Sequence, residues 1–337
     1  MENVNDTKSK EQMENYKSGF DYLNDVPVPL PNKSDNLKLI KADELEEEPI
    51  ELDSRIFSPN WNNKPVEKEP ILTLNGSPML TYQNVSVFVA GAGTGKSSVC
   101  EAICGAVIRE NKGGDTLGFE VSKKVKKVLF IDMERTNTDV WNSFVRMNKR
   151  AGLKQGDEQD KALFRGLRII TDLKERKESI MKLMKIHKPD LIILDGSGDL
   201  VDDPNCGKEA KGLTAWFRHL TSDFNCSIIT TLHPNKGTDN MRGHVGGELL
   251  REAEGISFIT KKGGIHRISS NHAQGKSRNS GPNDGEGLFT WSDSVNMFVN
   301  CYEEAGNVGR PKLEPLEDLS EDEIFALLDV SHGGLKA

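Results

Sequence analysis

No apolar run in the sequence approaches the roughly 18–20 residues that a helix needs to span a bilayer. The amino-terminal residues Met1 to Asp6 also lack an apolar signal segment behind a basic start, which argues against export. Cysteine is scarce: the five residues form an odd, unpatterned set that indicates no disulfide framework and favours a reducing compartment. These shortages predict a cytoplasmic protein with no membrane association.

The sequence also has no excess of basic residues: 44 basic and 52 acidic side chains give a formal net charge of −8. Taken as a whole, this balance weighs against a nucleic-acid partner. The acidic charge, however, is concentrated at the two ends. Residues 1–70 carry a net charge of −7 and residues 311–337 one of −5, which leaves 71–310 with +4. The body of the chain is mildly basic, so nucleic acid stays open as a partner.

Three regions differ in composition. Residues 1–55 are rich in Asn, Lys, Glu, Asp and Ser and poor in branched apolar residues, which predicts an acidic, disordered arm or a segment that folds on a partner. Residues 56–300 are expected to form one folded domain. Residues 301–337 are expected to be a second acidic tail with a short helix at 320–329, which begins with capping-box spacing at Ser320 and Glu323. Either acidic tail is a candidate for recruiting a protein partner.

Strand-like and helix-like segments alternate through the middle region. Strands are expected at 85–89, 127–131, 167–170, 191–194 and 226–231, and helices at 96–110, 137–151, 174–187 and 208–222. Nearly continuous apolar strands separated by helices indicate a mainly parallel sheet with helices on both faces, hence an α/β fold. A hairpin at 71–82, around Asn75-Gly76, and a C-terminal antiparallel hairpin at 256–268 flank this pattern.

The strongest chemical signal lies between the strand at 85–89 and the helix at 96–110. It fits the phosphate-binding loop pattern, with Ala in place of the first Gly. Glycines let backbone N–H groups converge on phosphates, and the helix amino terminus adds its dipole. We expect the lysine to reach the β- and γ-phosphates of ATP and the serine after it to bind Mg²⁺. The expected binding residues are Ala90, Gly91, Ala92, Gly93, Thr94, Gly95, Lys96, Ser97 and Ser98.

A carboxylate that completes such a magnesium site is expected at the end of a neighbouring buried strand. Residues 191–194 are apolar and are followed directly by Asp195, which therefore becomes the candidate Mg²⁺ residue beside Ser97. Asp199 lies four residues further on and is interpreted as a loop acid or a helix cap.

A second strand, 128–131, also ends in acid, at Asp132 and Glu134. Here the sequence resembles RecA-like ATPases, in which the strand after the phosphate-loop helix ends in a carboxylate that orients the attacking water. The resemblance implies a RecA-like P-loop NTPase core, with Glu134 as general base and Asp132 structural. It also implies that His233, at the end of the strand 226–231, senses the γ-phosphate. The alternatives are a surface acid for Glu134 and a packed histidine for His233.

Residues 232–250 make the resemblance to RecA-like ATPases more specific. Leu-His-x-Asn-Lys followed by Arg-Gly-His-x-Gly-x-Glu-Leu is similar to RepA-type ATPases, the plasmid and mobile-element relatives of the DnaB hexameric helicases. The resemblance implies a homo-oligomeric ring, expected to be a hexamer, in which Lys276 and Arg278 project into the neighbouring subunit's site. It also implies a loop whose Lys236, Arg242 and His244 contact single-stranded DNA. A solvated loop and an exposed basic turn are the alternatives.

These observations predict a Mg²⁺-dependent ATP hydrolase of the ring-forming, helicase-like class that acts on single-stranded DNA. Arg135 follows Glu134 where relatives often have Gln, and no helicase collar or primase-like domain is evident in the sequence. Two other functions therefore stay open. One is a RecA-like ATPase switch that regulates a protein partner, and the other is a strand-exchange recombinase.

Overall fold

The computed structural model describes residues 69–109, 114–235, 237–238, 240–278 and 285–301, together with positions 59, 61, 62 and 64. The chain divides into two units, Met1–Pro65 and Val66–Ala337, and all the helices and strands described below belong to the second. The predicted arm at 1–55 and the predicted helix at 320–329 lie outside the described residues.

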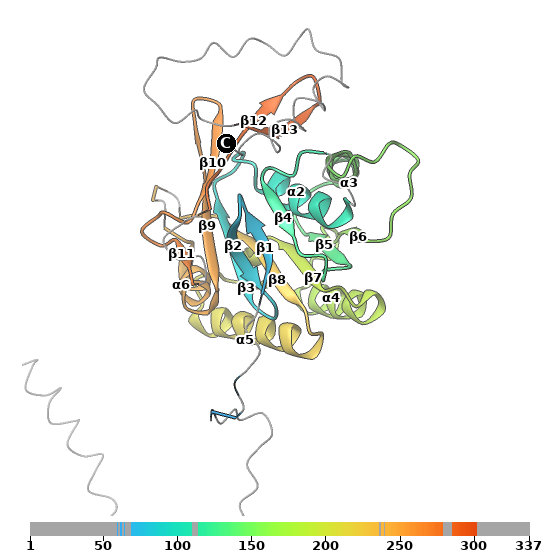
Figure 1. Ribbon diagram of the computed structural model, residues 1–337. Coiled ribbons are helices and arrows are strands. Elements are labelled where there is room, and N and C mark those ends of the chain that lie inside the picture. Colours follow the sequence, from blue (N-terminus) through green and yellow to red (C-terminus); the bar gives the residue numbers. More distant parts are fainter. Residues whose placement is uncertain are drawn as a thin grey trace, which may run out of the picture. The chain divides into compact units, whose positions relative to one another are not determined.

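A ten-stranded sheet forms the centre of the second unit (Figure 1). Its main path runs in the order β13-β12-β10-β9-β3-β8-β7-β5-β6, and β11 pairs with β9 at the side. The parallel strands are β3 (Val85–Ala90), β5 (Val128–Asp132), β6 (Ala162–Gly166), β7 (Leu191–Asp195), β8 (Ser227–Leu232) and β9 (Gly255–Lys262). The antiparallel strands are β10 (Ile265–Ser269), β11 (Lys276–Ser277), β12 (Gly287–Ser292) and β13 (Met297–Asn300). The predicted α/β class and mainly parallel sheet are confirmed.

Helices cover both faces of this sheet. Successive strand residues point to opposite faces, so Ile193 of β7 packs in one hydrophobic core while Ile192 and Leu194 pack in the other. The first core includes residues of α2 (Lys96–Ile108) and α3 (Asn137–Arg150). The second includes residues of α4 (Leu173–His187), α5 (Gly207–Asp223) and α6 (Gly243–Glu252). None of the helices in the described part of the chain is long and apolar enough to cross a membrane.

A small antiparallel sheet lies beside α2. The predicted hairpin at 71–82 is confirmed as β1 (Pro70–Leu74) and β2 (Ser77–Thr81). The φ angles of Asn75 and Gly76 are 48° and 82°, and the type I′ turn requires positive φ at both positions. The sequence does not predict the third strand, β4 (Phe119–Val121), which pairs with β1.

The expected strand at 167–170 is wrong. The sheet contains β6 at Ala162–Gly166 instead. The N–H of Leu167 still donates to the carbonyl of Asp132 at 2.7 Å, but the chain then turns, and Ile170 N–H donates back to Leu167. Ile169 is 86% exposed, so an apolar segment that resembles a strand contributes little to the core.

The predicted C-terminal hairpin is confirmed as β9 and β10, joined at Gly263 and Gly264. Two features of it were not predicted. β9 also pairs with β3 in parallel, so the hairpin belongs to the main sheet. Strands β12 and β13, coloured orange to red in Figure 1, extend the sheet beyond β10.

Candidate functional site

The chemically active candidates gather where the parallel strands end. In the sheet, β8 lies between β3 and β7, and β5 follows β7. Asp132 and Asp195 are register partners at the carboxyl ends of β5 and β7. The carboxyl ends of parallel strands form one edge of an open α/β sheet, and ligands of such folds bind at that edge.

The glycine-rich loop 90–97 leaves β3 at this edge and runs directly into α2. Gly95 is the N-cap residue of α2, with a φ of 96°, and no side-chain hydrogen bond among the described residues caps the helix. The first N–H groups of a helix have no partner within the helix. The amino terminus of α2 therefore presents backbone donors and the positive end of its dipole, which suits an anion.

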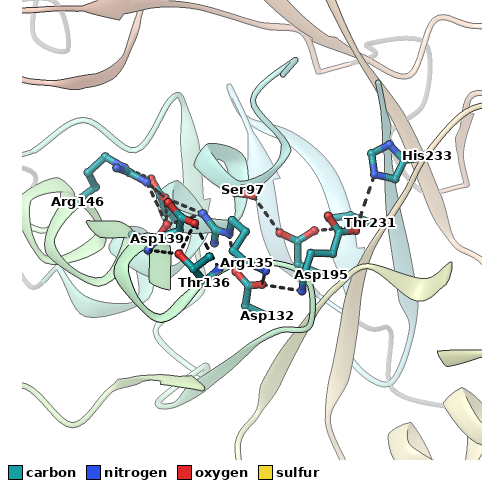
Figure 2. Close-up of polar contacts among 12 residues, drawn as sticks. Ser97, Asp132, Arg135, Thr136, Asp139, Arg146, Asp195, Thr231 and His233 are labelled. Atoms are coloured by element: carbon teal, nitrogen blue, oxygen red, sulfur yellow. Dashed lines mark hydrogen bonds and ion pairs between the residues drawn. The ribbon is translucent and has the colours of Figure 1, made fainter. Parts of the chain in front are cut away.

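Ser97, Asp195 and Thr231 form a chain of hydrogen bonds across α2, β7 and β8 (Figure 2). Ser97 Oγ donates to Asp195 Oδ2 at 3.0 Å, and Thr231 Oγ1 donates to Asp195 Oδ1 at 2.5 Å. Burial raises the pKa of the Asp195 carboxyl, and the opposing effects of Lys96 and of the Thr231 hydrogen bond are smaller. A buried, desolvated carboxylate beside a hydroxyl is an environment that a cation stabilises.

The donor set fits Mg²⁺. Ser97 and Asp195 both supply oxygen, the ligand type that magnesium prefers, and magnesium is usually held by one or two protein ligands plus waters and substrate phosphates. The described residues contain no cluster of three or more His, Cys, Asp or Glu side chains that could hold a metal by themselves. Thr231 was not among the predicted site residues, although a threonine near the carboxyl end of the strand next to β7 is a usable sequence signal.

Lys96, His233 and Glu134 converge from three different elements. Lys96 Nζ lies 2.7 Å from His233 Nε2, and the same His233 nitrogen lies 3.7 Å from Glu134 Oε1. The interaction with His233 lowers the pKa of the Glu134 carboxyl; burial opposes this shift and the charge of Lys96 reinforces it. Glu134 is therefore a carboxylate at neutral pH, and its side chain is 38% exposed. An ionised, solvent-accessible carboxylate is able to accept a proton from water.

Asp132 shapes the turn that carries Glu134. Its Oδ1 accepts hydrogen bonds from the N–H groups of Glu134 and Arg135, at 3.0 and 2.9 Å. Its Oδ2 accepts from Arg135 Nε at 2.5 Å (Figure 2). Asp132 is fully buried, in keeping with a structural role.

Arg135 connects this turn to α2 and α3, a feature that the sequence did not predict. Arg135 Nη1 donates to Ser143 Oγ at 2.6 Å and lies 3.9 Å from Glu101 Oε1. Glu101 is fully buried and also accepts hydrogen bonds from Ser143 and Arg146. The strand end that carries Glu134 is thereby tied to the helix that follows the glycine-rich loop. The identity of Arg135 was visible in the sequence, but its partner lies 34 residues away on another element.

The remaining candidates lie around α6. Lys276 Nζ donates to the carbonyls of Leu250 and Arg251, at 2.8 and 3.2 Å, and Arg278 Nη2 donates to that of Arg251 at 3.0 Å. Within the single chain, both cations thus bind the carboxyl end of α6, where a helix favours positive charge.

The two described candidates for DNA contact lie at the other end of the same helix. Arg242 is the N-cap residue of α6, His244 lies in its first turn, and both are exposed. Lys236, the third, lies outside the described residues. The structure therefore brings together Lys96, Ser97, Glu134, Asp195 and His233 beside the glycine-rich loop. It places Arg242, His244, Lys276 and Arg278 at the two ends of α6.

A scan against models of protein families finds no match to this chain, and a search of curated proteins finds no significant match. The roles of the clustered residues therefore rest on their own chemistry and on the motifs in the sequence.

Proposed function

We propose that the protein hydrolyses ATP in a Mg²⁺-dependent reaction. The observation that carries the proposal is the convergence of Lys96, the Ser97–Asp195 pair and the Glu134–His233 pair beside the uncapped amino terminus of α2. The five side chains come from elements spread over more than a hundred residues of sequence. A glycine-rich turn with only a structural role would not require all five.

Each group has a role that follows from its chemistry. The N–H groups of the loop and the Lys96 ammonium bind the β- and γ-phosphates. Ser97 and Asp195 hold the magnesium ion, which, when bound, neutralises charge on the phosphate oxygens. Glu134 takes a proton from water as the water oxygen bonds to the γ-phosphorus. The bond from that phosphorus to the bridging oxygen breaks, leaving ADP and inorganic phosphate.

Action on single-stranded DNA by a ring of identical subunits is the further part of the proposal. It is supported by the resemblance to RepA-type ATPases, by the +4 charge of residues 71–310, and by the exposure of Arg242 and His244. In a ring, Lys276 and Arg278 would exchange the carbonyls of α6 for the phosphates bound by a neighbouring subunit. Cations in that position stabilise the charge that develops on the transferred phosphoryl group.

The test compares the rate of ATP hydrolysis by the full chain with and without single-stranded DNA. Glu134→Gln is expected to lower kcat at least 10²-fold while the nucleotide still binds, because the amide cannot accept the proton. Glu178→Gln, which changes an exposed glutamate on α4, is the matched control. Unchanged turnover in Glu134→Gln would remove Glu134 from its role, and absence of hydrolysis in the unsubstituted chain would overturn the proposal.

The second candidate is an ATPase switch that regulates a protein partner. The contacts of Lys276 and Arg278 with α6 favour it, because both cations are already satisfied within their own chain. DNA-stimulated hydrolysis, together with binding that weakens steeply with salt, supports the motor. Hydrolysis that is indifferent to DNA supports the switch.

A further inference from the structure

Three aromatic rings from the antiparallel part of the sheet pack together next to the glycine-rich loop. They belong to His266 of β10, Phe289 of β12 and Phe298 of β13. The His266 ring stacks on that of Phe289 with centroids 5.1 Å apart and meets that of Phe298 edge-on at 4.6 Å. His266 is 2% exposed and Phe289 is fully buried. The histidine is thus held by packing on two sides.

This cluster touches the loop at two consecutive residues. His266 Nδ1 lies 2.8 Å from the carbonyl oxygen of Thr94. A Cβ atom added to Gly95 would approach Phe289 Cε2 to 2.8 Å, closer than real Cβ contacts, so the backbone at Gly95 lies directly on that ring. Because a carbonyl oxygen only accepts, Nδ1 carries the proton, and the hydrogen bond fixes the tautomer of His266.

The hydrogen bond between His266 and Thr94 also determines the direction of the Gly95 N–H. The Thr94–Gly95 peptide unit is planar, so its C=O and N–H groups point in opposite directions. Holding the Thr94 carbonyl toward His266 therefore directs the N–H of Gly95 away from the aromatic cluster. That N–H belongs to the set of donors at the amino terminus of α2.

We propose that His266 is a positioning residue, which orients the Thr94–Gly95 peptide so that the loop is preorganised to receive phosphate. The inference rests on the proposed function of the loop as a phosphate site. It assigns a task to β10, β12 and β13, the strands beyond the parallel sheet. Burial lowers the pKa of His266, so the ring is neutral at pH 7 and donates through Nδ1.

Two substitutions in the full chain separate the donor from the ring. His266→Phe keeps an aromatic ring and removes the donor, whereas His266→Asn places an amide N–H near the position of Nδ1 and removes the ring. We expect His266→Phe to weaken binding of a fluorescent ATP analogue with Mg²⁺ about tenfold, the loss typical of one hydrogen bond. His266→Asn is expected to stay within about threefold of the unsubstituted chain.

The matched control is His272→Phe, since His272 also stacks on an aromatic ring, that of Phe258, while its Nδ1 accepts a hydrogen bond from the N–H of Gln274. Amide hydrogen exchange of the segment 91–97, measured without nucleotide, gives a second readout. His266→Phe is expected to speed this exchange and His266→Asn to restore it, with a thermal melt to show that each variant is folded.

The outcomes distinguish this inference from the proposed function. If the unsubstituted chain binds no nucleotide, the proposed function fails, while the exchange measurement still tests the orientation of the loop. If the chain binds nucleotide and His266→Phe matches it in both affinity and exchange, the positioning role is overturned. If His266→Phe does not fold, amide exchange in His266→Asn tests the positioning role. Fast exchange of the segment 91–97 in a folded His266→Asn contradicts that role.

Discussion

The side-chain nitrogen of Lys96 lies 2.7 Å from Nε2 of His233. The imidazole of His233 therefore contacts the amine of Lys96 directly. Because Glu134 Oε1 lies 3.7 Å from the same Nε2, His233 lies between the side chains of Lys96 and Glu134. A phosphate that draws Lys96 to itself would therefore change the partners of His233 and Glu134 together.

This relationship predicts a selective loss in His233→Ala. We expect kcat for ATP hydrolysis to fall about 10²-fold, the usual effect of removing one polar group that acts on the transition state. The nucleotide dissociation constant is expected to change by less than about threefold, because the loop amides and Lys96 remain. Steady-state hydrolysis and equilibrium binding measure the two quantities. His219→Ala, on the exposed side of α5, is the control; equal losses in binding and in kcat would contradict the prediction.

The parallel part of the fold was predictable because its signals are local. Residues 191–194 form an uninterrupted apolar run, and the glycine-rich loop marks the junction of a strand and a helix. The segment 167–170 met the same local criterion, but the prediction was wrong because its apolar residues follow strand β6 instead of forming it, and Ile169 is exposed. Strand β4 has only three residues and pairs with β1, which is distant in sequence, so periodicity does not reveal it.

The same difference between local motifs and tertiary contacts applies to the candidate site. Lys96, Ser97 and Asp195 occur in recognisable motifs, and in the structure Ser97 bonds to Asp195 while Lys96 contacts His233. The contacts that hold the site residues in place could not be predicted from the sequence, because Arg135 approaches Glu101 only when α2 and α3 pack on the sheet. His266 likewise reaches Thr94 across 172 residues of sequence. Motifs therefore indicate the reacting groups, whereas the residues that hold them depend on tertiary packing.

Arg135 gives a prediction about stability. Arg135→Ala removes the cation beside the buried carboxylates of Asp132 and Glu101. Breaking a buried pair by removing one partner costs about 3–5 kcal/mol, and the lower end is expected because the Arg135 side chain is 20% exposed. Urea unfolding of the full chain measures the loss.

The control for this prediction is Arg251→Ala. The Arg251 side chain is 76% exposed and pairs with Glu248 on the surface of α6, so its loss is expected to cost about 0–1 kcal/mol. Equal effects of the two substitutions would show that the buried network contributes no more than a surface pair.

The cysteines give a prediction about reactivity. Cys100, Cys104 and Cys226 are buried, whereas Cys206 and Cys301 are partly exposed. Burial raises the pKa of Cys226 to about 12 and also raises those of Cys100 and Cys104. Since the thiolate is the reactive form, these three thiols are expected not to react with a thiol reagent between pH 7 and 9.

A chromogenic thiol reagent tests this expectation. The native protein is expected to show two reactive thiols, with rates that rise with pH, and the unfolded protein all five. The double variant Cys206→Ser, Cys301→Ser is expected to react only after unfolding. A third thiol that reacts rapidly in the native protein would contradict the burial of Cys100, Cys104 and Cys226.

Two glycines of the loop give a matched comparison. Gly93 and Gly95 have positive φ angles of 70° and 96°, so alanine is strained at both, by about 1 kcal/mol. An added Cβ meets nothing within 4 Å at Gly93 among the described residues, but at Gly95 it comes within 2.8 Å of Phe289 Cε2. Overpacking costs about 1–3 kcal/mol more. Gly95→Ala is therefore expected to be the more destabilising substitution in urea unfolding.

The source of that difference is tested by Phe289→Leu. A smaller side chain at position 289 gives the new methyl group room, so the double variant Gly95→Ala, Phe289→Leu is expected to be more stable than the sum of the two single losses implies. Residues in contact show such coupling, of about 0.5–3 kcal/mol. Combining Gly93→Ala with Phe289→Leu is expected to be additive. Additive losses in both double variants would mean that the Phe289 ring does not contact the glycine-rich loop. Coupling seen only with Gly95→Ala would show that the ring of Phe289, on β12, contacts the loop at Gly95.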